Sequence, residues 1–209
     1  MKPVKPIKIE KNMTTKQLVK TMESAGFGAG KIAKSSEIMK KMFNDKDCRV
    51  FLGLAGAMVP AGMKEIITDM LNKTDVFVTT GANLTHDLIE ALGHSHYLIE
   101  KQMTDEELNK KNLDRIYNIL MENKVYVKLE DFFRKNKEQF KQCTNIKELL
   151  WKIGELAPNN CILKKCYEKK IPIFCPAIAD SGIGLMFWGM IAEGEKFPVN
   201  VFEDMSEII

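Results

Sequence analysis

The pattern of apolar and polar positions predicts an alternation of strands and helices in the first half of the chain. Residues 49–55 and 75–81 are short, nearly continuous apolar runs, typical of parallel strands that are covered on both faces. Segments with helical spacing of apolar residues follow them, and we expect helices over about residues 60–71 and 84–92. Pro60 suits the first turn of the former helix, where an amide would be unpaired anyway. This alternation favours a parallel sheet with right-handed crossovers.

The remaining segments extend this pattern. Apolar residues at helical spacing in residues 14–43 predict two helices around a glycine-rich turn at residues 26–30. Residues 103–168 are helical in pattern and highly charged, so we expect a solvated layer on the sheet. Two further apolar runs, residues 170–176 and 199–203, predict a third and a fourth strand.

The end of the sequence indicates an incomplete core. Residues 205–209 resemble the opening turn of a helix, and no residues remain to close it. An apolar face would then stay uncovered, so we expect either another chain that completes the core or a fragment. The predicted organisation is a flexible N-terminal arm over residues 1–13 and one α/β domain over residues 14–209.

Composition narrows the class of protein. The 31 basic and 28 acidic residues give a net charge of +3, too balanced for a nucleic-acid footprint. The longest nearly apolar run, residues 50–63, is shorter than the roughly 20 residues that a membrane helix needs. The N-terminus lacks the apolar stretch of a secretory signal. Five scattered cysteines in such a chain favour free thiols in the cytoplasm, so we expect a cytoplasmic protein without nucleic-acid or membrane partners.

Three loops are candidates for ligand binding. Residues 56–60, 80–83 and 180–182 each follow a predicted strand and contain small residues. In open parallel sheets, ligands lie outside the carboxyl ends of the strands, where helix N-termini offer unpaired amides to phosphates. The alternative is that these are tight turns without a ligand. None of them matches a standard nucleotide fingerprint.

Four side chains could add chemistry. His86 is either a polar ligand or base, or a solvated residue of a first helical turn. His94 and His96 alternate in one loop, but no third ligand is evident nearby, so we expect no metal site. Asp180 is the carboxylate best placed for a ligand, unless it only caps the following helix.

Four segments together resemble one protein family. Residues 51–62, 75–88 and 171–184, with the turn at residues 24–29, are similar in order and spacing to the deoxyhypusine synthase family. The resemblance runs over about residues 14–205. It implies a Rossmann-like, mostly parallel α/β sheet with flanking helices, and here the sheet is incomplete at the C-terminus.

The resemblance also implies an activity. Members of the family are usually tetramers that bind NAD and a polyamine at subunit interfaces, and they transfer the aminobutyl group of spermidine to a lysine of a translation factor. By position, the residues expected to contact NAD are Gly56, Ala57, Met58, Val59, Pro60, Thr80, Gly81, Ala82 and Asp180. Thr85 and His86 fall at the substrate-binding positions.

The sequence departs from the family pattern at three places. Thr85 and His86 replace a pair of glutamates, and Leu185 replaces a second aspartate, which weakens the acidic surroundings of a cationic amine. These changes resemble the prokaryotic branch, some of whose members make homospermidine or join two agmatine molecules. The imine-forming lysine, in a Trp-Gly-Lys setting, belongs to a C-terminal half that this sequence lacks. Lys152 in Trp151-Lys152-Ile153-Gly154 has the letters in another order, so no catalytic residue is predicted.

Three hypotheses follow for the function. The chain is the N-terminal part of a deoxyhypusine synthase-type transferase that works only with a complementary lysine-bearing chain. Alternatively, it is a non-catalytic homologue that binds and regulates a full-length relative, or a truncated product without a role. We expect NAD as the cofactor, a homo- or hetero-oligomer, and no catalysis by the isolated chain.

Overall fold

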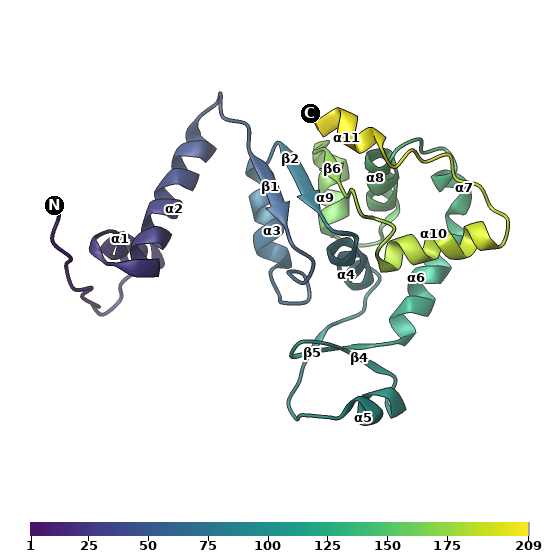
Figure 1. Ribbon diagram of the computed structural model, residues 1–209, viewed down its shortest axis with the longest axis horizontal. Helices are drawn as coiled ribbons and strands as arrows, with labels where there is room; N and C mark the ends of the chain where they lie inside the picture. Colours follow the sequence, from purple (N-terminus) through teal and green to yellow (C-terminus); the bar gives the residue numbers. More distant parts are fainter. Residues whose placement is uncertain (209) are drawn as a thin grey trace. The chain divides into compact units, whose positions relative to one another are not determined.

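The computed structural model describes residues 1–208, and the chain divides into two compact units, residues 1–50 and 51–209 (Figure 1). The first unit contains helix α1 (Thr15–Thr21), the 3-10 helix η1 (Met22–Ser24) and helix α2 (Phe27–Asn44). Thr14 begins α1 with a capping box. The predicted turn at residues 26–30 is wrong beyond Gly26, because α2 starts at Phe27. Gly30 instead allows close packing, since a Cβ there would lie 2.5 Å from the carbonyl oxygen of Ala25.

The second unit is built on a parallel three-stranded sheet. Its strands are β1 (Phe51–Leu54), β2 (Val76–Thr79) and β6 (Ile173–Phe174), in the order β1-β2-β6. Phe51 pairs with Val76, and Phe77 pairs with Ile173. The predicted parallel sheet and three of its strands are confirmed.

Helices flank this sheet. Those of the second unit are α3 (Lys64–Met70), the 3-10 helix η2 (Leu71–Lys73), α4 (Gly81–Ala91), α5 (Asp105–Lys110), α6 (Lys124–Lys135), α7 (Lys137–Phe140), α8 (Ile146–Leu156), α9 (Ile162–Lys169), α10 (Gly182–Ala192) and α11 (Glu203–Ile208). Helices α8 and α9 pack closely at Gly154, where a Cβ would lie 2.3 Å from the carbonyl oxygen of Leu163. None of the helices within residues 1–208 has the length and apolar character of a membrane span.

Two expectations for the first strand and helix are wrong. The outward side chains of β1 are exposed, with Phe51 at 56%, because β1 lies at the edge of the sheet order. Pro60 does not open a helix, because residues 56–62 form a series of turns and α3 starts only at Lys64. The buried Pro60 therefore shapes the loop that follows β1.

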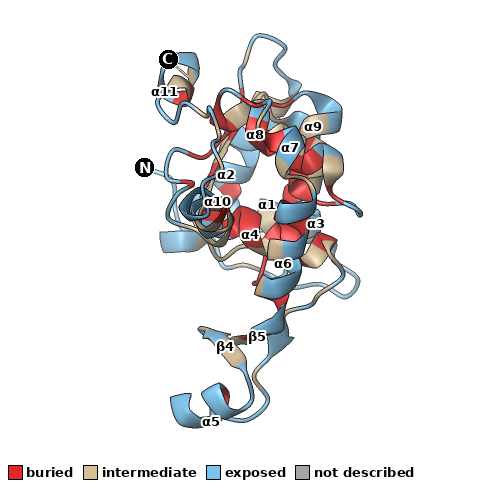
Figure 2. Ribbon diagram, turned by 90° about the vertical axis from the view of Figure 1, so that its right-hand side faces the viewer, coloured by how far each residue is buried: buried red, intermediate tan, exposed pale blue. Residues whose placement is uncertain are grey.

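A small antiparallel sheet interrupts the segment that we expected to be helical. Strands β3 (Tyr97–Leu98), β4 (Leu113–Ile116) and β5 (Ile119–Glu122) pair in the order β3-β5-β4, and with α5 they project from the rest of the unit (Figure 2). The hairpin turn uses Tyr117 at φ 55° instead of a glycine. The usual glycine signal of a tight hairpin is therefore missing from the sequence.

The expected solvated layer of residues 103–168 is confirmed only in its charged outer faces, and the fourth strand is wrong. Helices α6, α8 and α9 bury large apolar side chains in the core, although their charged residues face outward (Figure 2). The rings of Phe133, Phe140 and Phe187 lie within 5.2–5.6 Å of one another. Asn200 makes only an isolated bridge to Asn145, and α11 begins at Glu203, so residues 199–203 add no strand to the sheet.

Candidate functional site

The three predicted loops come together at the carboxyl edge of the parallel sheet. A Cβ on Gly56 would lie 3.2 Å from Oγ1 of Thr80, so the loop after β1 touches the loop after β2. A Cβ on Gly81 would lie 2.4 Å from Oγ of Ser181, so the loop after β2 touches the loop after β6. A Cβ at Gly81 would clash with Ser181, whereas a Cβ at Gly56 would require Thr80 to shift by a few tenths of an ångström, so glycine keeps the loops close at both joints.

Hydrogen bonds hold the first two loops in place. The amide of Val59 donates to Oδ1 of Asn83 at 3.2 Å, and Nδ2 of Asn83 donates to Oγ1 of Thr79 at 3.4 Å. The hydroxyl of Thr79 in turn donates to the carbonyl of Leu54 at 3.1 Å. The fully buried Asn83 therefore links β1, β2 and the loop at residues 56–60, a role that the sequence did not indicate.

Helix α4 begins in the middle loop. Thr80 is its N-cap and accepts a hydrogen bond from the amide of Asn83, one turn earlier than a helix start at residue 84 would require. The amides of Gly81 and Ala82 make no hydrogen bond to any residue between 1 and 208, as is usual in a first helical turn. This end of α4 can offer both amides to an anion.

The residues predicted to contact NAD lie at this edge of the sheet and differ in solvent exposure. Thr80, Ala82 and Asp180 are exposed, and Gly56, Ala57 and Met58 are half-buried. Val59 and Pro60 are buried, as is Gly81 at the joint. The small-residue loops and the exposed carboxylate fit a dinucleotide, because the backbone can approach its diphosphate and Asp180 can accept hydrogen bonds from ribose hydroxyls.

Thr85 and His86, which we predicted together, point to different neighbours. The hydroxyl of Thr85 donates to the carbonyl of Gly81 at 2.8 Å and accepts from the amide of Ile183 at 3.1 Å. Thr85 is buried, so it fastens α4 to α10. One residue later on the helix, the half-buried His86 faces His96.

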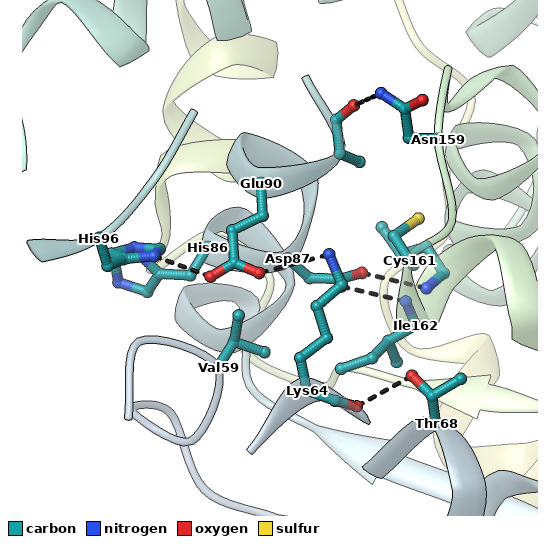
Figure 3. Close-up of polar contacts among 12 residues, drawn as sticks. Val59, Lys64, Thr68, His86, Asp87, Glu90, His96, Asn159, Cys161 and Ile162 are labelled. Carbon is teal, nitrogen blue, oxygen red and sulfur yellow. Dashed lines mark hydrogen bonds and ion pairs between the residues drawn. The ribbon is translucent and has the colours of Figure 1, made fainter. Parts of the chain in front are cut away.

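A polar cluster extends from His86 along one side of α4 (Figure 3). Nδ1 of His86 lies 3.0 Å from Nε2 of His96, whose Nδ1 lies 2.9 Å from Oε1 of Glu90. The second carboxylate oxygen of Glu90 lies 3.3 Å from Nζ of Lys64 at the start of α3. These side chains form one continuous polar path.

Burial and neighbouring charges shift the pKa values in this cluster. Burial, together with the adjacent His96, lowers the pKa of His86 to about 4, against the opposing effect of Glu90. Burial acts to raise the pKa of Glu90, but the hydrogen bond from His96 and the ammonium of Lys64 outweigh it, so that pKa lies below its usual range. At neutral pH, His86 is uncharged and Glu90 is an anion.

Asp87 takes a different position on the same helix. Its fully buried carboxylate accepts hydrogen bonds from the amides of Ile162 at 3.0 Å and Leu163 at 3.2 Å, and Nζ of Lys64 lies 3.8 Å away. These amides belong to the first turn of α9, so Asp87 anchors that helix to α4. Burial raises its pKa to about 6, against the two amides and Lys64.

Sequence reasoning missed Lys64, Glu90 and the contact between His86 and His96. A signal was available, because His86 and Glu90 are four residues apart and therefore share one helix face. Within residues 1–208, no three or more His, Cys, Asp or Glu side chains are grouped as metal ligands.

The fold is that of an α/β protein with a candidate ligand site at the carboxyl ends of its parallel strands. The sequence pattern of the deoxyhypusine synthase family matches residues 17–209. The chain belongs to the deoxyhypusine synthase family.

Similar proteins agree with this assignment. Proteins named probable deoxyhypusine synthase from Methanosarcina thermophila and probable deoxyhypusine synthase 1 from Methanosarcina mazei are each 40% identical over 99% of this chain. The chain spans 66% of the length of each. A crystal structure from Entamoeba histolytica that bears the same family name has a TM-score of 0.64 at 17% identity, covering 94% of this chain and 73% of its own. That likeness supports the fold.

Proposed function

We propose that the chain forms the NAD-binding part of a deoxyhypusine synthase-type transferase. The observation that carries this proposal is the joining of three small-residue loops at Gly56 and Gly81, in a chain of this family. Bound NAD would accept a hydride from the amine substrate. Gly81 and Ala82 would face its diphosphate, and Asp180 would hold a ribose.

We propose further that a complementary segment or chain supplies the lysine that receives the aminobutyl group. The relatives are longer than this chain, which spans 66% of their length. Helix α10 is apolar all round, yet Leu185, Trp188 and Ile191 on it are 51–66% exposed. A helix of this composition is typically buried on every side, so this exposed face is a fitting place for the complementary part.

The lack of acidic side chains at positions 85 and 86 favours a second candidate. Thr85 is occupied by backbone contacts and His86 is neutral, so neither provides the negative charge that a polycation such as spermidine would find at a glutamate pair. An enzyme that makes homospermidine or joins two agmatine molecules is therefore the alternative within the same chemistry.

The test is binding and turnover with the protein purified from its native cell together with whatever co-purifies. We expect NAD binding by calorimetry, and Asp180→Asn should weaken it about tenfold or more, because a hydrogen bond to a charged group is lost. Asp69→Asn, an exposed carboxylate on α3, is the matched control. Identification of the product formed with NAD from spermidine or from agmatine would then separate the two candidates. Equal NAD affinity of all three proteins would contradict the proposed site.

A further inference from the structure

The polar path on α4 is built by a specific chain reversal. The helix ends in a Schellman motif, in which the amide of Gly93 donates to the carbonyl of Glu90 and the amide of His94 donates to the carbonyl of Ile89. Gly93 takes the required left-handed conformation at φ 91°. This turn brings His96 back beside the helix, where it meets both His86 and Glu90.

The hydrogen bonds along the path determine where the protons lie. A carboxylate can only accept, so Nδ1 of His96 carries a proton and donates to Glu90. When His96 is neutral, its Nε2 has a lone pair and must accept from Nδ1 of His86. Nε2 of His86 is then left with a lone pair of its own.

That lone pair is open to a ligand. Nε2 of His86 makes no hydrogen bond to residues 1–208. In the same residues, the buried side-chain nitrogen and oxygen atoms without a partner are the two carboxylate oxygens of Asp204, so Nε2 of His86 is not a buried atom. It therefore reaches the surface, on the helix that begins at the loop edge.

We propose that His86, His96 and Glu90 form a proton relay that takes a proton from the amine substrate, an inference that rests on the proposed function. The ammonium N–H bond breaks as its proton binds to Nε2 of His86. The proton on Nδ1 of His86 moves to Nε2 of His96. The products are a free amine, a neutral His86 with its proton on Nε2, and a His96 imidazolium beside the Glu90 carboxylate.

The surrounding charges favour this distribution. His86 is a poor place for a positive charge, because burial holds its pKa near 4. The charge on His96 instead lies 2.9 Å from Glu90, whose other oxygen is paired with Lys64 from α3. Asp87, about 100° around the helix from His86, faces Lys64 and α9. The relay thus separates the atom that meets the substrate from the site that stores the charge.

The relay serves a need of amine oxidation. An ammonium group has no lone pair on nitrogen and gives up a hydride from the adjacent carbon only after it has lost a proton. A base that is unprotonated at working pH can accept that proton directly. In this scheme His86 is the catalytic residue, and His96 and Glu90 are positioning residues.

Nitrogen NMR of the imidazoles tests the relay without cofactor or substrate. The 209-residue chain has three histidines, so its ¹⁵N-histidine resonances can be assigned with single variants. At about pH 8 we expect the proton of His86 on Nδ1. On acidification, the proton of His86 should move from Nδ1 to Nε2 in the same step in which the hydrogen-bonded pair of His86 and His96 takes up one proton.

Two variants sharpen the test. Glu90→Gln keeps an acceptor for His96 but removes the negative charge, so the coupled step should move to lower pH by about one unit or more. His94→Gln alters a neighbouring histidine whose ring has no contact with the path, and the step should not move. A His86 that carries its proton on Nε2 at high pH, or that titrates independently of His96, would overturn the relay.

The relay and the proposed function can fail separately. If the coupled step is present but the purified complex neither binds NAD nor oxidises an amine, the relay stands without this substrate. If the complex is active, His86→Gln should lower its turnover by about 100-fold and Glu90→Gln should move the acidic limb of its pH profile. An active complex in which neither variant changes turnover or its pH profile would overturn the relay.

Discussion

His86 and Asp87 are neighbours in the sequence, yet the structure gives them opposite surroundings. Asp87 is fully buried, and two amides of α9 and the ammonium of Lys64 surround its carboxylate. His86 is half-buried, and one of its ring nitrogens has no hydrogen-bond partner among residues 1–208. A polar group whose partners are complete holds the fold together, whereas a polar group with one open position is available for chemistry.

Burial shifts the pKa values of these neighbours in opposite directions for one reason. A low-dielectric environment disfavours charge, so it raises the pKa of Asp87 to about 6 and lowers that of His86 to about 4. At neutral pH, Asp87 is still an anion because the amides and Lys64 compensate for burial, and His86 is neutral. The two groups therefore differ in charge as well as in contacts.

The largest effect on stability that we expect comes from removing the carboxylate of Asp87. Asp87→Ala removes the acceptor of two buried amides and one partner of Lys64, so the free energy of unfolding should fall by about 3 to 5 kcal/mol. Chemical denaturation measures this loss. Asp69→Ala, an exposed carboxylate on α3, should change stability by less than about 0.5 kcal/mol. A loss below about 1 kcal/mol for Asp87→Ala would mean that this anchor is unimportant.

The different roles of these two side chains could not be predicted from the sequence. Adjacent residues on a helix point about 100° apart, so Thr85, His86 and Asp87 meet different elements although they lie in one motif. The motif predicted the right helix and the right edge of the sheet. The partners of His86 and Asp87, at His96 and at the start of α9, depend on how distant segments pack.

Packing between distant segments also limited how much of the fold could be predicted from the sequence. The strands at residues 51–54, 76–79 and 173–174 were predictable because each is a short apolar run followed by small residues. The hairpin at residues 113–122 was not, because Tyr117 takes a positive φ without the glycine that usually announces such a turn. Charge in residues 103–168 hid the buried faces of amphipathic helices, and core packing decided which face lies inside.

An intermediate effect should come from the cation that both sides share. Lys64→Met leaves the Asp87 and Glu90 carboxylates without their ammonium, so we expect a loss of about 1 to 2 kcal/mol at pH 7.5. The loss should shrink at pH 5, because Asp87 takes up a proton as the pH falls through about 6. Denaturation curves at both pH values measure the difference. The control Lys73→Met, at an exposed lysine, should show none, and a loss that does not depend on pH would contradict the role of Asp87.

The smallest effect isolates His86 through the pH dependence of stability. The folded-state pKa of His86 is depressed, so between about pH 6.5 and pH 4 the unfolded chain binds a proton at His86 and the folded chain does not. Above this pH window, His86 has no effect on the free energy of unfolding. As the pH falls through the window, His86 lowers the free energy of unfolding of the wild type, by under about 1 kcal/mol at pH 6. His86→Gln should therefore gain stability relative to the wild type on acidification.

The comparison with His86→Gln also cancels the opposing contribution of Asp87. The raised pKa of Asp87 means that the folded state binds its proton first, which increases stability as the pH falls from about 6 towards the unfolded value. Both proteins keep Asp87, so its contribution cancels in the difference between them. The stability of His94→Gln should depend on pH as that of the wild type does. Parallel curves of stability against pH for all three proteins would show that the pKa of His86 is not depressed in the folded state. The two sides of the helix would then differ only in packing, and the open nitrogen of His86 would lose its distinction from an ordinary surface histidine.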